Sequence, residues 1–120
     1  MSGIPEFGDA ELWVIKSALK ERYGKDLEVE LADSELRLHP DDRELTLCPT
    51  VFWQERGASF VLCKVAENRY RSLFFYSARE QYGTGRQEYD DLADCVLTLL
   101  RLQADHEAKR AVAGGEPTRR

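Results

Sequence analysis

The chain is predicted to fold as one α+β domain, with an N-terminal helix, a five-stranded antiparallel meander and a long C-terminal helix. Both helices are expected to pack on one face of the sheet. Apolar residues recur at helical spacing over about 9–23 and 87–109. Between these segments, short runs rich in β-branched and aromatic residues are separated by turn-forming residues, which favours pairing of sequential strands. A length of 120 residues is typical of a single domain.

The N-terminal helix is predicted over residues 9–23. Asp9 is a suitable N-cap, and Gly24 is a suitable residue to end the helix. The apolar stripe between them consists of Leu12, Ile15, Leu19 and Tyr23. Residues 1–8 before the helix are interpreted as a disordered or cloning-derived leader, because residues 3–7 resemble the product of a cloning site.

A first hairpin is expected over residues 27–38, turning at Asp33 and Ser34. With that turn, Leu31 lies opposite Leu36, and Glu30 lies opposite Arg37. Apolar pairs then share one face and an ion pair lies on the other. A third strand is predicted over 44–54, in which Pro49 indicates a bulge or an edge segment.

A second hairpin is predicted from strands 58–66 and 69–77, joined by a two-residue loop of Glu67 and Asn68. In that register Lys64 lies opposite Arg71, and both faces of the hairpin are apolar. A sheet with helices on one side normally alternates apolar and polar residues. The second face is therefore expected to be covered by another segment, a partner or a ligand.

Positive charge on this hairpin marks the first candidate binding residues, Lys64, Arg69 and Arg71. Like charges opposite each other in a sheet repel. Either a neighbouring acid neutralises them, or they bind an anionic ligand or an acidic partner surface. Residues 79–86 are predicted to form a loop before the last helix, where backbone N–H groups can bind an anion. This loop adds Tyr82, Thr84 and Arg86 to the candidates, although the favoured interpretation is a capping loop with no ligand.

The C-terminal helix is predicted over residues 87–109. Its apolar residues occupy more than one face, and acidic residues at its start and basic residues at its end complement the helix dipole. Residues 110–120 contain two glycines, one proline and a terminal arginine pair without apolar periodicity. This segment is expected to be a disordered tail, so the domain is predicted to span residues 9–109.

Composition excludes several functional classes. The net charge of −5 argues against nucleic-acid binding, and the absence of a long apolar run argues against a membrane span. The three cysteines, Cys48, Cys63 and Cys95, are odd in number and widely spaced, so they form neither a disulfide framework nor a zinc motif. We expect them to be reduced and buried, in a cytoplasmic protein.

The sequence contains no recognisable catalytic set. No Ser-His-Asp or Cys-His combination and no phosphate-binding glycine motif is present. Asp90 and Asp94 lie one helical turn apart, but without further ligands they are interpreted as residues that complement the helix dipole rather than as a metal site. We therefore expect no cofactor and no metal, and an enzyme is the third hypothesis.

The order helix, strands, helix resembles that of small secretion-chaperone-like and immunity-type proteins, although no motif supports this resemblance. The leading hypothesis is a non-enzymatic protein–protein interaction module of adaptor, chaperone-like or immunity type. It is expected to form a homodimer through the outer face of strands 58–66 and 69–77 or through the last helix. The alternative is a small-ligand or anion-binding domain that uses Lys64, Arg71 and the loop of residues 82–86.

Overall fold

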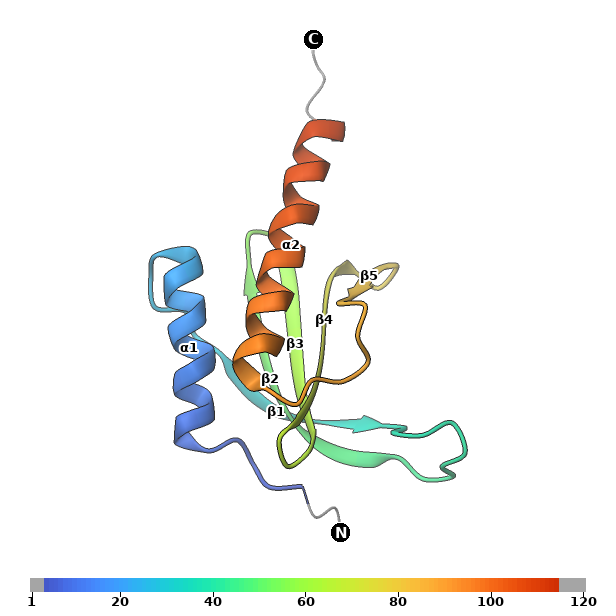
Figure 1. Cartoon of the computed structure of the whole chain (residues 1–120). Helices are drawn as coiled ribbons and strands as arrows, with labels where there is room; N and C mark the ends of the chain where they lie inside the picture. The colour runs from blue at the N-terminus through green and yellow to red at the C-terminus, as the bar shows by residue number, and fades with distance from the viewer. Residues whose placement is uncertain (1–3, 115–120) are drawn as a thin grey trace.

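The computed structural model describes residues 4–114, with side chains described as far as Arg110 (Figure 1). In chain order the elements are α1 (Asp9–Tyr23), β1 (Glu30–Leu36), β2 (Thr46–Glu55), β3 (Ala58–Ala66), β4 (Arg69–Ser77), β5 (Glu80–Gly83) and α2 (Leu92–Gly114). The strands form one antiparallel sheet in the order β1-β2-β3-β4-β5. The predicted class, an α+β fold with a five-stranded meander between two helices, is confirmed.

Both helices cover the same face of the sheet (Figure 1). The core lies between the helices and the three central strands, because each of these elements contributes fully buried side chains. These include Ile15 and Leu19 from α1, Val96 and Leu99 from α2, and Trp53, Phe60 and Leu62 from the sheet. We call the face of the sheet that packs against α1 and α2 the helix-covered face, and we call the opposite face the open face. No helix within residues 4–114 is long and apolar enough to cross a membrane.

Helix α1 has the predicted bounds. The Glu11 carboxylate accepts a hydrogen bond of 2.8 Å from the Gly8 backbone N–H, so Gly8 rather than Asp9 is the N-cap residue. At the other end Gly24 adopts a φ of 74°, and its N–H donates to the Lys20 carbonyl at 2.7 Å. A left-handed residue is needed to end the helix in this way, which explains the glycine.

The predicted hairpin over residues 27–38 is wrong, because residues 30–36 form one continuous strand. β1 pairs with β2 along its whole length, with Asp33 opposite Pro49 and Ser34 opposite Cys48. The Ser34 hydroxyl also accepts a hydrogen bond of 2.8 Å from Thr50. The residues that were expected to turn therefore pair with β2 as part of an extended strand. Pro49 lies just beyond Thr50, where the β2–β3 pairing begins, which agrees with the predicted edge segment.

The fifth strand lies where a loop was predicted. Residues 80–83 pair with β4, and Tyr82 lies opposite Phe74. The two rings also stack, with their centroids 5.4 Å apart. Aromatic packing of this kind stabilises a strand too short and too polar to be detected by its periodicity.

The predicted register of the β3–β4 hairpin is wrong by one residue. Ala66 pairs with Arg69 around the expected loop, but a bulge follows, so that Lys64 lies opposite Tyr70 and Cys63 opposite Arg71. One inserted residue moves the following side chains of a strand to the other face. Lys64 and Arg71 therefore lie on opposite faces of the sheet, and the prediction that they share one face is wrong.

Helix α2 begins at Leu92, later than the predicted residue 87. The Asp91 carboxylate accepts the Asp94 N–H at 3.1 Å and so caps the helix. Tyr89 exchanges two backbone hydrogen bonds with Tyr70, of 2.8 and 2.9 Å, which hold the preceding residues extended against β4. The helix continues to Gly114, beyond its predicted end at residue 109.

Part of the predicted leader packs against the domain. Phe7 contacts the core on the helix-covered face, and Ile4 contacts a buried cluster on the open face. The Glu6 carbonyl accepts a hydrogen bond of 3.3 Å from Lys64. Residues 1–3 of the predicted leader and residues 115–120 of the predicted tail lie outside the described residues.

Candidate functional site

The open face carries a row of apolar side chains across the central strands. The pairing places Phe52 opposite Val61, and Val61 opposite Leu73. Each of the three is half-buried, whereas their apolar neighbours on the helix-covered face are buried. We call these residues the open-face row. It bears out the expectation that both faces of β3 and β4 are apolar.

One end of the open face is covered by the chain itself. Cys48, Cys63 and Val65 form a buried cluster there. Ile4, Leu36 and Leu38, which come from the N-terminal segment and from the end of β1, pack over this cluster. Val61 of the open-face row also packs against this cluster, whereas Phe52 and Leu73 do not, so another segment covers only part of the second face.

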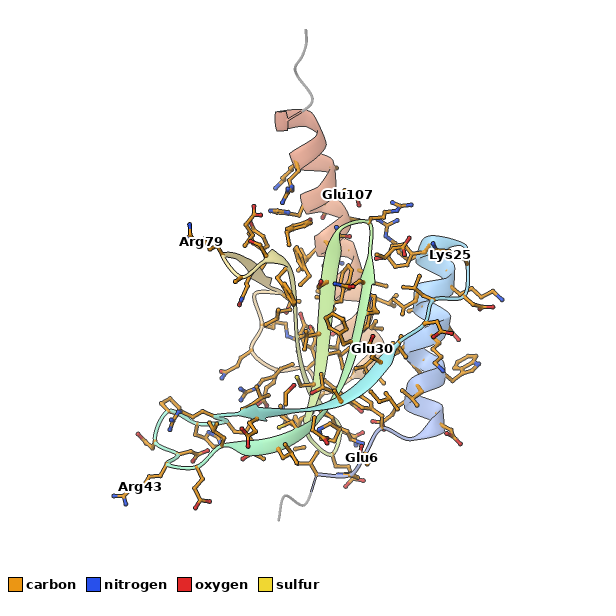
Figure 2. All side chains as sticks on the ribbon, turned by 180° about the vertical axis from the view of Figure 1, so that it is seen from behind. Glu6, Lys25, Glu30, Arg43, Arg79 and Glu107 are labelled. Carbon is orange, nitrogen blue, oxygen red and sulfur yellow. The ribbon has the colours of Figure 1, made fainter. Side chains whose placement is uncertain are left out.

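Between the covered end and β5 lies a cleft of about 530 Å³. Although β1 and β5 are opposite edges of the sheet, both contribute to it, so the sheet curls around the open face. Figure 2 shows the molecule from the side on which the strands lie in front of α2. The lining includes Ser34 and Leu36 from β1, Val61 and Cys63 from β3, Arg71 and Leu73 from β4, Tyr82 from β5, and Arg86 from the following loop.

Arg71 is the half-buried cation of this cleft. Its Nη2 and Nε donate to the Glu88 carboxylate at 2.9 and 3.2 Å, and Nη2 also donates to the Leu38 carbonyl at 3.0 Å. These bonds fix the plane of the guanidinium. Nη1 forms no hydrogen bond with any residue of the range 4–114. A neighbouring acid therefore neutralises Arg71, while part of its guanidinium stays available to the cleft.

Two of the three candidate residues in the predicted loop, Tyr82 and Arg86, line the cleft. The Arg86 guanidinium lies 4.3 Å from the Tyr89 ring centre and forms an ion pair of 3.1 Å with Asp94. The Tyr82 ring packs against His106, with a centroid distance of 4.2 Å. Thr84 does not line the cleft; its hydroxyl donates to the Arg86 carbonyl at 3.3 Å.

Lys64 belongs to the helix-covered face instead. Its Nζ lies 3.0 Å from the Glu11 carboxylate, which also accepts a hydrogen bond of 2.5 Å from the Tyr70 hydroxyl. A neighbouring acid thus neutralises this cation too, and Lys64 is a buried structural residue. Arg69 is exposed, and it has no ion pair among the described residues.

Contacts within the Lys64–Glu11–Tyr70 cluster shift the pKa values of Glu11 and Tyr70 in opposite directions. Burial by itself raises the pKa of the Glu11 carboxyl, but hydrogen bonds from Tyr70, the Gly8 backbone and Lys64 outweigh burial and hold that pKa below its ordinary value. Burial and the hydrogen bond to Glu11 raise the pKa of Tyr70. At neutral pH Glu11 is therefore a carboxylate and Tyr70 a neutral phenol.

The residues of the cleft that the sequence prediction missed include Ser34, Leu36 and Cys63. The Thr50 hydroxyl lies 2.8 Å from the Ser34 hydroxyl and 3.4 Å from the Cys63 sulfur. Thr50 therefore links the cleft residue of β1 to the cleft residue of β3. Locating this group requires the pairing of β1 with β2, which the predicted hairpin excluded. Residues 30–36 show no regular alternation of apolar and polar residues, and Leu31 and Leu36 lie on opposite faces, so periodicity gave no signal for this strand.

All three cysteines are free and buried, as predicted. Burial raises the pKa of the Cys48 and Cys63 thiols, and it raises the pKa of Cys95 to about 11. A thiolate nucleophile is therefore disfavoured at Cys63, although this residue lines the cleft. Among the described residues, no group of three or more histidine, cysteine, aspartate or glutamate side chains is arranged to hold a metal ion.

Comparison of this chain with protein-family models, with curated proteins and with solved structures gives no significant match. The resemblance to secretion-chaperone-like and immunity-type proteins in the order of elements thus stays a prediction. Functional conclusions rest on the geometry of the open face.

Proposed function

We propose that the chain is a non-enzymatic protein–protein interaction module that binds another protein through the open face. The open-face row carries this proposal, because Phe52, Val61 and Leu73 are half-buried on the face of the sheet that neither described helix covers. An apolar centre bordered by charged residues is typical of protein interfaces, and Arg71 and Arg86 provide such a border. An adaptor, chaperone-like or immunity-type role in the cytoplasm fits this surface.

The same surface supports the expected homodimer. A two-fold axis brings a row of uncharged apolar side chains against its own copy, which makes an isologous contact without like charges at its centre. Light scattering over a dilution series is expected to show a dimer that Leu73→Glu converts to a monomer. A wild-type protein that stays monomeric at high micromolar concentration would contradict the homodimer. Binding of a different protein is tested separately.

Site-specific photo-crosslinking tests binding of a different protein. A benzophenone amino acid at position 73 is expected to crosslink a partner in the native host. The matched control has the same amino acid at position 97, because Leu97 is also an apolar residue and is 52% exposed on α2. Adducts at position 73 that are absent at position 97 support the proposal, whereas identical adducts at both positions, or none, contradict it.

A small anionic ligand with an apolar body is the second candidate. It is favoured by Arg71 and Arg86 lining one cleft of about 530 Å³, a volume within the usual range of small-molecule sites. A fatty monocarboxylate such as octanoate, or phosphate or sulfate, is then expected to raise the melting temperature of the wild type but not of Arg71→Ala. Arg69→Ala is the control, because Arg69 lies outside the cleft. No shift with any of these anions would exclude this candidate.

A further inference from the structure

The two edges of the sheet differ in how they are protected. β5 has four residues and an irregular register with β4. β1 has seven residues, pairs with β2 without a register shift, and contains neither proline nor lysine. Short length, bulges, proline and lysine are the usual devices that prevent a strand edge from pairing with another chain. Within residues 4–114 no backbone hydrogen bond joins the outer edge of β1 to another segment.

Neither of the two described helices covers β1. Its residues are exposed or half-buried, and Leu31 is 62% exposed. Leu47 of the neighbouring strand is also exposed, and it lies on the same side of the sheet, because it pairs with Glu35 and Leu31 pairs with Val51. The free edge therefore has an apolar strip beside it, as well as unpaired backbone groups.

The charge of β1 determines what can pair with it. Glu30, Asp33 and Glu35 are exposed and have no ion pair among the described residues. A second copy of β1 at this edge would bring three carboxylates toward three others, and like charges on paired strands repel. The edge is thus open to a strand of opposite charge and closed to its own copy.

We infer that the outer edge of β1 binds an extended basic segment of a partner protein, which adds to the sheet as an antiparallel strand. Backbone hydrogen bonds supply affinity in this mode of recognition, and alternate side chains supply specificity. Lysine or arginine opposite Glu30, Asp33 and Glu35 neutralises the edge, and an apolar residue opposite Leu31 covers the exposed side chain. The inference rests on the proposed function in that the partner is a protein, but it uses the edge of β1 and not the open-face row.

A designed peptide serves as the probe. Read antiparallel to β1, from the position opposite Leu36 to that opposite Glu30, the matching sequence is Val-Lys-Thr-Lys-Thr-Val-Lys. The charge control replaces each lysine with glutamate. The backbone control keeps all side chains but carries N-methyl groups on alternate residues, which removes the N–H donors needed for strand addition. Fluorescence polarisation of labelled peptides, with the full chain, measures binding.

Matched protein variants locate the contact. The edge variant is Glu30→Gln, Asp33→Asn and Glu35→Gln. The control variant neutralises three exposed acids elsewhere, Glu67→Gln, Asp90→Asn and Asp105→Asn, so both variants change the net charge equally. We expect the edge variant to weaken binding by at least about tenfold, since three cross-strand charge pairs are lost. The control variant is expected to bind the peptide as the wild type does.

Amide hydrogen exchange gives the decisive readout. The lysine peptide is expected to slow exchange at residues 30–36, and the N-methylated peptide is not. The inference is overturned by a lack of saturable binding, by equal binding to both protein variants, or by binding that leaves exchange at residues 30–36 unchanged. Leu73→Glu is expected to bind the peptide normally, so failure here is distinguishable from failure of the open-face proposal, which the crosslinking at position 73 tests separately.

Discussion

The helix-covered face and the open face are built from alternate residues of the same strands, yet they differ in burial. Phe74 on the helix-covered face is buried beneath α2, while its neighbour Leu73 on the open face is half-buried and lines a cleft. Successive side chains of a strand point to opposite sides of a sheet. One strand therefore supplies stability through one set of residues and a surface for binding through the other.

The charged residues of the two faces differ in the same way. The Lys64 side chain is 6% exposed and the Arg71 side chain is 21% exposed, and each is paired with one glutamate. A cation that is removed from water depends more strongly on its partner, because solvent no longer compensates for loss of the pair. The Lys64–Glu11 pair is accordingly a structural element, and the Arg71–Glu88 pair is a part of the cleft that water still reaches.

The largest expected effect comes from truncating neighbouring side chains on the two faces. Phe74→Ala removes a buried ring and leaves a cavity, so we expect it to lower the free energy of unfolding by about 3–5 kcal/mol. Leu73→Ala is expected to cost about 1 kcal/mol, because the side chain is half-exposed already. Urea unfolding of both variants measures the difference. Equal losses would show that the open face is packed like a core.

A second comparison removes one cation from each face. We expect Lys64→Ala to lower the free energy of unfolding by about 3 kcal/mol, because the Glu11 carboxylate loses its buried partner. Arg71→Ala is expected to cost about 1 kcal/mol, since Glu88 can be hydrated. Lys64→Met keeps the apolar stem and so separates lost charge from lost packing. A greater loss for Arg71→Ala than for Lys64→Ala would reverse the roles assigned to these residues.

The pH dependence of stability tests the Glu11 cluster. The pKa of Glu11 is lowered from 4.5 in the folded state, so its carboxylate stabilises the fold above that pH, and the contribution is lost as pH falls through the folded pKa. We expect Glu11→Gln to cost about 1–2 kcal/mol at pH 7 and progressively less below about pH 4.5. Chemical denaturation at pH 7, 5 and 3 checks this. A difference that stays constant across these conditions would contradict the assignment.

The last comparison concerns the thiols, whose predicted behaviour changes reactivity and not stability. Burial raises the pKa of all three cysteines, so at neutral pH we expect the native protein to react with a thiol reagent at least about a hundredfold more slowly than the protein in urea. The absorbance of the released chromophore gives both rates. One fast-reacting thiol in the native protein that is lost in Cys63→Ser would contradict this prediction. It would show that small molecules reach Cys63 through the cleft.

Elements determined by local sequence were predicted well. The bounds of α1 follow from the apolar stripe and from Gly24, and the loop between β3 and β4 follows from Glu67 and Asn68. The register beyond that loop was not predictable from the hairpin. Val65 packs with Cys48 and Cys63, and Lys64 reaches Glu11, and these contacts with β2 and α1 favour the bulge. Arg71, Tyr82 and Arg86 consequently meet at one cleft, whereas Lys64 lies on the other face.

The amino-acid sequence alone determined the α+β class, the two amphipathic helices, the strands β3 and β4 with two apolar faces, and the buried state of the cysteines. These properties depend on periodicity and composition within short segments. The tertiary structure decided that residues 30–36 form one edge strand, that residues 80–83 form the other, and which apolar face remains open. Strand alternation establishes that two faces exist, but their covering depends on segments that are distant in the chain and meet only when the sheet has formed.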